Sequence, residues 1–381
     1  MKWITTILIL CVAVLTGLGM VMLYSSSMNM EVNKSAVGAH YLLSQLAWCA
    51  FGIFGFALAA FTDYRRLKGL SPWLLALSVL LLLLVFSPAI GIAAKGAHRW
   101  IGRPGLPHLQ PSELAKLALI VFLAAYADRY QRQMDKFKKG VLIPGAVIAC
   151  VLLPIYFEPD RGCTILLVAV SGVMLIVAGT RLLFLIPPAL VAGGLLAISF
   201  LHDKMRMGRL WAWLHPELSK DGAGYQAYQA MIAMGSGGWT GLGLGNGRQK
   251  LGFVPEQHTD FIFSIIGEEL GLLATLVVLA LFIVLLVCGV RIARRSCDTF
   301  GFLLGTGLTF MIGFQAFVNM GVVTSVLPNK GMPLPFISYG GSNLVLMLLS
   351  VGLLVSIARF ATEVAPRKSN PFEAPPEADN D

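Results

Sequence analysis

The chain has 381 residues, of which 56% are hydrophobic and only 13% are charged, and its formal net charge is +9 at neutral pH. A water-soluble protein carries about twice that share of charged residues. The composition therefore excludes a soluble globular protein and predicts a chain that folds in lipid, where helices or a closed barrel satisfy the backbone polar groups. The apolar stretches are continuous rather than alternating, which favours helices.

Ten apolar segments are predicted to be transmembrane helices, because each provides most of the roughly 20 residues that a span requires. In chain order they are Trp3–Leu23, Tyr41–Phe61, Pro72–Ile90, Pro111–Ala127, Val141–Phe157, Thr164–Gly179, Leu182–Leu201, Phe261–Val290, Phe300–Val323 and Ser342–Phe360. The first segment begins like a signal peptide, but its length and the lack of a clean cleavage site favour a retained helix. The predicted fold is an all-α integral membrane protein of about ten transmembrane helices, with a long outer loop, residues 202–260, between the seventh and eighth.

Lys and Arg residues in the short loops predict the orientation, because such residues are enriched on the cytoplasmic side. They gather in the loops after the second, fourth and eighth segments: Arg65, Arg66, Lys68, Arg129, Arg132, Lys136, Lys138, Lys139, Arg291, Arg294 and Arg295. We therefore expect both termini to be cytoplasmic. Residues 1–364 are expected to form one membrane domain, and residues 365–381, which are rich in Pro, Glu and Asp, a disordered cytoplasmic tail.

Three segments are then expected on the outer side: residues 91–110, 202–260 and 324–341. The long loop is basic, and a long loop is exempt from the charge rule. Its cations are Lys204, Arg206, Arg209, Lys220, Arg248 and Lys250. They indicate either an anionic ligand at the outer surface or plain attraction to lipid headgroups, and the sequence does not separate the two.

Ionisable residues in or beside apolar segments are expensive to bury and are therefore candidates for function. Glu113 and Lys116 lie three residues apart and so share a helix face. Glu268 and Glu269 lie about two turns into the eighth segment. Pairing of Lys116 with one of these glutamates across the bundle would give them a structural role instead.

Asp260 lies where the long loop meets the eighth segment, so that water, lipid headgroups and a helix end come together around its carboxylate. The loop cations favour the charged form, which could take a proton from a sugar hydroxyl as a general base. The alternative is a helix N-cap, a position at which Asp is also favoured. Spacing alone does not choose between these roles.

The residues predict neither a dinucleotide site nor a metal site. The glycine-rich string at 241–247 has no preceding strand and no βαβ unit after it. The histidines lack metal-ligand spacing, and the cysteines are interpreted as small packing residues. These residues are His98, His108, His202, His215 and His258, and Cys11, Cys49, Cys150, Cys163, Cys288 and Cys297.

A series of motifs along most of the chain resembles the SEDS family, the shape, elongation, division and sporulation glycosyltransferases that polymerise bacterial cell-wall precursor. The motifs are Lys95–Ile101, Gln110–Lys116, Gly224–Gln226 with Gln229, Gly235–Gly238, Pro255–Phe263, Gly267–Gly271, and Lys330–Gly331 with Ile337–Ser342. Further similarity is to the division-type branch of the family rather than the elongation-type branch. It lies at Met22–Ser27, Gly243–Lys250 and Leu327–Gly331.

The resemblance implies that the enzyme joins lipid II units into β-1,4 glycan strands and releases undecaprenyl diphosphate. It implies that Asp260 is the general base, which deprotonates the acceptor 4-hydroxyl for an in-line, inverting attack on the anomeric carbon of the donor. Cations must stabilise the departing diphosphate. Candidate substrate-binding residues are Arg99, Trp100, Lys116, Arg206, Arg209, Tyr225, Gln229, Lys330 and Ser338, with Glu113, His258, Thr259, Glu268 and Glu269 as supporting residues. Trp100 and Tyr225 could equally anchor the chain at the membrane interface.

Two positions depart from the pattern of the family. Glu158–Cys163 stands where Gln-Pro-Asp-hydrophobic-Gly-Thr is usual, which puts Arg161 in an apolar position. The roles of Asp160 and Arg161 are therefore left open, and a local ion pair is the plain interpretation. His108 stands where some members carry a basic residue, and we assign it no role.

The resemblance also implies a class B penicillin-binding protein, which would crosslink the new strand, and other division proteins as partners. Membrane lipids are expected partners and nucleic acid is not. No cofactor is evident, although a divalent cation (Mg²⁺ or Mn²⁺) could assist the diphosphate. The expected location is the bacterial cytoplasmic (inner) membrane at the division septum. Two competing hypotheses are a lipid II flippase or transporter, whose key groups would lie near the midplane, and a scaffold that only recruits division proteins.

Overall fold

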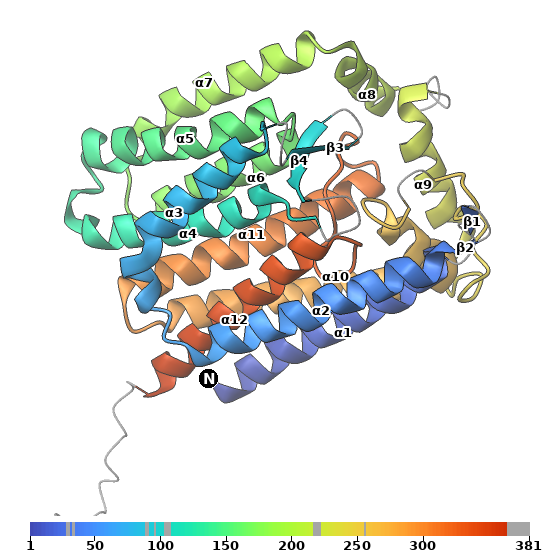
Figure 1. Ribbon diagram of the computed structural model, residues 1–381, viewed down its shortest axis with the longest axis horizontal. Coiled ribbons are helices and arrows are strands. Elements are labelled where there is room, and N and C mark those ends of the chain that lie inside the picture. Colours follow the sequence, from blue (N-terminus) through green and yellow to red (C-terminus); the bar gives the residue numbers. More distant parts are fainter. Residues whose placement is uncertain are drawn as a thin grey trace, which may run out of the picture.

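The computed structural model describes residues 1–27, 31–32, 35–87, 91–94, 97–102, 108–215, 222–254 and 257–363. Each of the ten apolar segments forms a helix, and these helices pack together as one bundle (Figure 1). They are α1 Lys2–Ser27, α2 Val37–Phe61, α3 Arg66–Leu84, α4 Pro111–Arg129, α5 Ile143–Phe157, α6 Arg161–Val177, α7 Leu182–Leu201, α10 Ile262–Arg294, α11 Thr299–Val323 and α12 Gly341–Glu363. The predicted tail, residues 365–381, lies outside the described residues.

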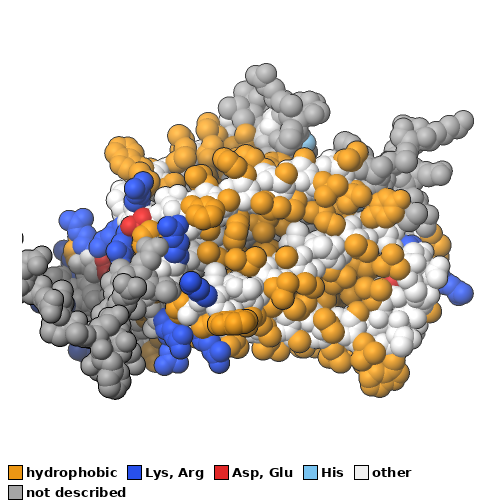
Figure 2. All heavy atoms as spheres, turned by 90° about the horizontal axis from the view of Figure 1, so that it is seen from below, with side chains coloured by type: hydrophobic (Ala, Val, Ile, Leu, Met, Phe, Trp, Pro, Cys, Tyr) orange, Lys and Arg blue, Asp and Glu red, His pale blue; other side chains and the backbone are white. Residues whose placement is uncertain are grey.

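Eight of the described helices are long and apolar enough to cross a membrane. The other two predicted spans are α4, which carries the buried Glu113 and Lys116, and α6, which has 17 residues. Figure 2 shows hydrophobic side chains covering the middle of one face, with Lys and Arg side chains gathered toward one end. An apolar belt of this kind is what a protein surrounded by lipid requires, and the number of spans stays a prediction.

Helices α11 and α12 lie at the centre of the bundle. In the most apolar 18-residue stretch of each helix, 67% and 72% of the residues are buried. Helix α7 is peripheral, because no residue in its most apolar stretch is buried. Leu183 and Leu190, for example, are 72% and 70% exposed. Buried polar side chains on α11, such as those of Gln315 and Asn319, therefore have no access to bulk water and must find partners inside the protein.

The long loop predicted between the seventh and eighth segments contains secondary structure of its own. It contains α8, Lys204–Leu214, and α9, Tyr225–Ser236, both too short to span. Two small antiparallel hairpins add to the all-α fold: β1 Glu31–Val32 with β2 Ser35–Ala36, and β3 Gly91–Ala94 with β4 Ala97–Ile101. Short 3-10 turns cover Gln131–Gln133 and Gly222–Gly224, and a π-helical turn covers Lys138–Leu142. A search for long apolar runs cannot detect such short elements, because they bury too little surface to show a pattern.

Helix α10 is interrupted at Gly271, whose φ of 79° lies in the left-handed region that favours glycine. The segment just after α9 supplies the hydrogen bonds that the interruption leaves unmade. The Leu272 amide donates to the carbonyl of Gly238 (2.9 Å), and the Leu242 amide donates to the carbonyl of Glu268 (3.0 Å). The first turns of α10 are thereby fixed to the loop that leads to Asp260.

The two ends of the bundle differ. Helices α8 and α9 and hairpin β3–β4 lie toward the end that we call the loop end, and α1 begins at the opposite end, the terminal end (Figure 1). At the terminal end, Lys68 forms an ion pair with Asp128, and Arg65 lies 3.7 Å from Asp298. Candidate residues for chemistry gather at the loop end.

Candidate active site

Asp260 is half-buried and lies just before α10, at the loop end. The N-cap position of α10 is Phe261, so Asp260 is not the residue that caps this helix. The backbone carbonyl of Asp260 accepts a hydrogen bond from Nδ2 of Asn319 on α11 (2.8 Å). Its carboxylate lies against the α-carbon of Gly331, so closely that a Cβ at that position would collide with Oδ2.

Residues 324–340, which join α11 to α12, form the centre of this site, and we call them the hub loop. Helix α8 contacts it through Trp213, whose Nε1 donates to the carbonyl of Ser325 (2.9 Å). Helix α9 contacts it through Gln226, whose Oε1 accepts from Asn329 (3.3 Å). The hub loop therefore contacts side chains that lie more than a hundred residues earlier in the chain.

Lys116 and Glu113 form a buried ion pair within α4 (2.8 Å). Lys116 also donates to Oε1 of Gln315 (3.2 Å), and Glu113 accepts from Nδ2 of Asn343 (3.0 Å). Gln315 in turn donates to the carbonyl of Pro333 in the hub loop (2.9 Å). The predicted pairing of Lys116 with a glutamate across the bundle is wrong, because its ion-pair partner is Glu113 on the same helix. Lys116 is 2% exposed and already has two partners, which favours a structural role for the pair with Glu113.

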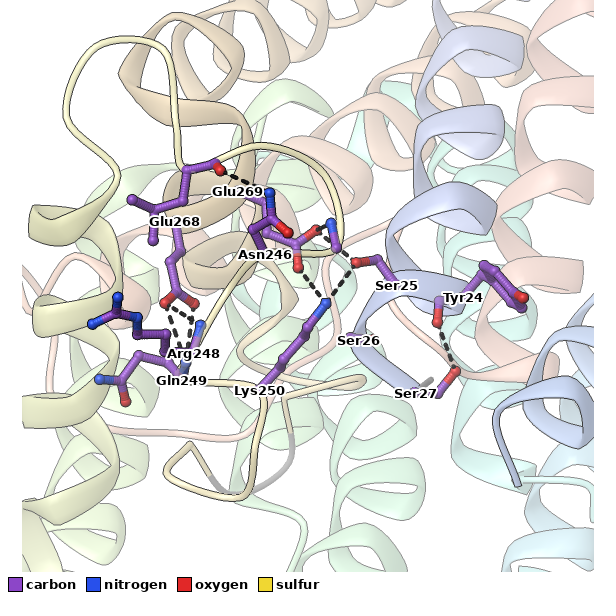
Figure 3. Close-up of polar contacts among 12 residues, drawn as sticks. Tyr24, Ser25, Ser26, Ser27, Asn246, Arg248, Gln249, Lys250, Glu268 and Glu269 are labelled. Atoms are coloured by element: carbon purple, nitrogen blue, oxygen red, sulfur yellow. Dashed lines mark hydrogen bonds and ion pairs between the residues drawn. The ribbon is translucent and has the colours of Figure 1, made fainter. Parts of the chain in front are cut away.

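Glu268 and Glu269 fasten the segment that precedes Asp260 onto α10 (Figure 3). Glu269 forms a buried ion pair with Lys250 (2.8 Å), and its other oxygen accepts from the Ser25 hydroxyl of α1 (2.6 Å). Glu268 accepts from the backbone amides of Arg248 (2.7 Å) and Gln249 (3.1 Å). The carboxylates of both glutamates are therefore committed to contacts within the protein.

Arg99 and Trp100 lie on β4 and are half-buried. Arg99 donates from Nε to the carbonyl of Glu158 (3.1 Å) and from a terminal nitrogen to the carbonyl of Pro159 (2.8 Å). These bonds hold hairpin β3–β4 against the turn between α5 and α6. Much of the guanidinium of Arg99 is thus committed to the backbone.

The turn between α5 and α6 contains the two residues whose roles were left open. The Asp160 side chain caps α6 by accepting from the amide of Cys163 (3.1 Å). Arg161 lies over the ring of Tyr156, 3.2 Å from its centroid, and donates to the carbonyl of Tyr156 (2.8 Å). Asp160 thus caps α6, and Arg161 contacts Tyr156 at the end of α5.

The remaining candidates are spread along the loop end. Arg209 is exposed on α8 and lines a cavity of about 70 Å³ with Trp213, Tyr228 and Asn329. Tyr225 and Gln229 are half-buried on α9. Lys330 is half-buried in the hub loop, beside Gly331. Arg206 also lies on α8, but its side chain is outside the described residues.

Three further candidates lie in or beside the hub loop. The ring of His258 lies 5.0 Å from that of Tyr41 and 5.9 Å from that of Tyr339, and Thr259 is half-buried next to it. The Ser338 hydroxyl accepts from the Leu334 amide (2.7 Å), which closes a turn within the loop. Ser338 is buried, and its hydroxyl thus supports the shape of the loop.

No group of three or more His, Cys, Asp or Glu side chains in the described ranges is placed to hold a metal ion. No residues can therefore be named as ligands for the divalent cation that the diphosphate chemistry suggested. We derive no catalytic step through a metal.

The polar side chains that hold the hub loop, namely Gln315, Asn319 and Gln45, were not predicted from the sequence. Gln315 and Asn319 lie four residues apart, so they share one face of α11. A pair of amides at this spacing in an otherwise apolar segment is a signal that a search limited to ionisable residues overlooks.

Comparisons with known proteins agree with this arrangement. Residues 5–363 match the family described as "Cell cycle protein", which comprises FtsW, RodA and SpoVE. The chain is 41% identical to a probable peptidoglycan glycosyltransferase FtsW of Trichlorobacter lovleyi over 92% of both chains. It is 35% identical to the stage V sporulation protein E of Bacillus subtilis, over 93% of this chain and 97% of that protein.

Two solved structures are similar in fold. One, from work described as "Structural coordination of polymerization and crosslinking by a peptidoglycan synthase complex", has a TM-score of 0.74 and 28% identity, over 93% of this chain and 97% of that chain. The other, RodA of Thermus thermophilus, has a TM-score of 0.66 and 27% identity, over 92% and 95%. With a family match along nearly its whole length, the chain belongs to the FtsW, RodA and SpoVE family of cell cycle proteins.

Proposed function

We propose that this protein is a peptidoglycan glycosyltransferase that polymerises lipid II into β-1,4 glycan strands during cell division. Relatives named as FtsW glycosyltransferases match 92% of the chain at 41–42% identity. The observation that carries the proposal for the site is the half-buried carboxylate of Asp260, which lies at a helix start against the bare backbone of Gly331.

In the proposed reaction, the Asp260 carboxylate takes the proton of the acceptor 4-hydroxyl. The oxygen of that hydroxyl forms a bond to the anomeric carbon of the donor, while the bond from this carbon to the diphosphate breaks. The diphosphate oxygen leaves with the electron pair. A single displacement of this kind inverts the anomeric configuration, and undecaprenyl diphosphate is released.

The departing diphosphate needs a cation to stabilise its charge, and the basic residues proposed for this role differ in their positions and contacts. Lys330 adjoins Gly331, which touches Asp260, so Lys330 is the favoured cation. Lys116 is 2% exposed and paired with Glu113, and Arg99 bonds the backbone of the α5–α6 turn. We therefore assign Lys116 and Arg99 a supporting role, and Arg209, Tyr225 and Gln229 a role in holding the distal parts of the substrate.

The proposed setting is the cytoplasmic membrane at the division septum, with both termini cytoplasmic and the loop end outside. Lys and Arg side chains at the terminal end support this orientation (Figure 2). The proposed partner is a class B penicillin-binding protein, which would crosslink the strand. The similarity to a chain from a peptidoglycan synthase complex supports such a partner.

The decisive experiment measures polymer formation from labelled lipid II by the purified protein with its penicillin-binding partner, for the wild type and Asp260→Asn. We expect polymer from the wild type and a loss of at least about 100-fold in the variant, the lower end of what a general base supplies. Matching thermal unfolding of the two proteins in detergent is the control for folding. Equal polymer from both would remove Asp260 as the base and favour the flippase.

A further inference from the structure

Asn319 is a buried amide on the central helix α11, with 1% of its surface exposed. Its Nδ2 donates to two backbone carbonyls, those of Asp260 (2.8 Å) and Met332 (2.6 Å). An amide nitrogen has two hydrogens, so both are used. One side chain therefore ties the residue that carries the candidate base to the hub loop.

Gly331 makes the complementary contact on the side chain of Asp260. The three atoms nearest to a Cβ built on Gly331 all belong to the Asp260 carboxyl group. Gly331 is not among the residues with positive φ, so its backbone would accept an alanine. Glycine is needed at this position because the carboxylate approaches the α-carbon, and not because of the backbone conformation.

A third contact fixes the same segment two residues earlier. The amide of Tyr339 donates to the carbonyl of His258 (3.0 Å). The hub loop thus holds the chain both at His258 and, through Asn319 and Met332, at Asp260. With its backbone held at two points and its carboxylate against Gly331, Asp260 has little freedom to turn.

We propose that Asn319 and Gly331 are positioning residues for Asp260: Asn319 fixes its backbone, and Gly331 leaves the space that its carboxylate occupies. This inference rests on the proposed function, in which Asp260 is the base. A misplacement of about 1 Å at a reacting group can lower the rate about 100-fold, because proton transfer requires close alignment.

The test compares Asn319→Ala and Gly331→Ala with the wild type, each as the full chain with its penicillin-binding partner. Initial rates are measured over a range of lipid II concentrations. We expect kcat to fall by about 100-fold in both variants, while KM stays within about threefold. Asn319→Ala removes two hydrogen bonds and lowers the unfolding temperature. Gly331→Ala removes none, so it keeps the test valid if Asn319→Ala does not fold.

Ser356→Ala is the matched control. Ser356 on α12 is also fully buried, and its hydroxyl accepts from the Tyr64 amide (3.3 Å) and donates to the carbonyl of Thr62 (2.7 Å). Both partners lie at the terminal end, away from the hub loop, so we expect a similar loss of unfolding temperature with only a small change in kcat.

The inference is overturned if the kcat of both test variants matches that of Ser356→Ala, or if KM rises while kcat stays unchanged. Asp260→Asn, measured beside them, separates this failure from failure of the proposed function. If the wild type forms polymer and Asp260→Asn does not, Asp260 stands as the base and only the positioning role is lost.

Discussion

Two fully buried glutamates near the loop end, Glu269 and Glu158, have opposite surroundings, although both are 0% exposed. Glu269 is bonded by the ammonium of Lys250, the hydroxyl of Ser25 and the amide of Gly245 (2.8, 2.6 and 3.1 Å). Neither carboxyl oxygen of Glu158 has a hydrogen-bond partner among the described residues. The nearby guanidinium of Arg99 instead bonds the carbonyls of Glu158 and Pro159.

The comparison shows that the role of a buried glutamate depends on the hydrogen-bond donors around its carboxylate. Burial without donors, reinforced by the charge of Asp160, raises the pKa of Glu158 to about 8, although Arg99 acts in the opposite direction. Glu158 is thus a neutral acid over most of the physiological pH range. Glu269, by contrast, connects α1, α10 and the segment before Asp260 through its ion pair and hydrogen bonds (Figure 3).

The largest expected effect comes from breaking the ion pair between Lys250 and Glu269. Lys250→Met leaves the Glu269 carboxylate buried without its cation, and we expect the free energy of unfolding to fall by about 3–5 kcal/mol. Thermal or denaturant unfolding in detergent measures this. The double variant Lys250→Met with Glu269→Gln removes both charges and should recover most of the loss. A double variant no more stable than the single one would contradict the ion-pair interpretation.

A smaller effect is expected at Glu268, whose carboxylate accepts from the amides of Arg248 and Gln249. Glu268→Gln keeps the shape but replaces a charged acceptor with a neutral one, so we expect a loss of about 1–2 kcal/mol. Limited proteolysis should cut within residues 241–254 more readily in this variant. Unchanged stability and unchanged cleavage would show that these bonds do not fasten the loop.

The smallest effect at acidic pH is expected for Glu158→Gln, because glutamine closely resembles a protonated glutamate. The folded pKa of Glu158 is raised, so the wild type is fully stable below the ordinary glutamate value of about 4.5 and loses stability as the pH rises to about 8. The variant should lack this loss. Unfolding temperatures of the two proteins should therefore converge near pH 5 and separate near pH 8, with the variant higher. Parallel curves would mean that Glu158 does not titrate in this range.

Much of the fold could be predicted from the sequence, because long apolar runs such as Phe300–Val323 have only one stable form in lipid. The structure confirms helices in all ten predicted segments. The interruption at Gly271 and the short helices α8 and α9 were missed, since each depends on hydrogen bonds to distant residues. The placement of Asp260 at a loop–helix boundary followed from its position beside an apolar run.

The amino-acid sequence alone determined that this is a membrane protein, which segments are helical, and which ionisable residues are candidates for function. These properties follow from hydrophobicity and local spacing. Only the tertiary structure decided which polar groups meet. It joined Lys116 to Gln315 and Glu113 to Asn343, directed Arg99 to backbone carbonyls, and placed Asn319 and Gly331 around Asp260. Inside a lipid-embedded bundle each buried donor must find an acceptor, and the packing of distant helices, not the order of residues, selects it.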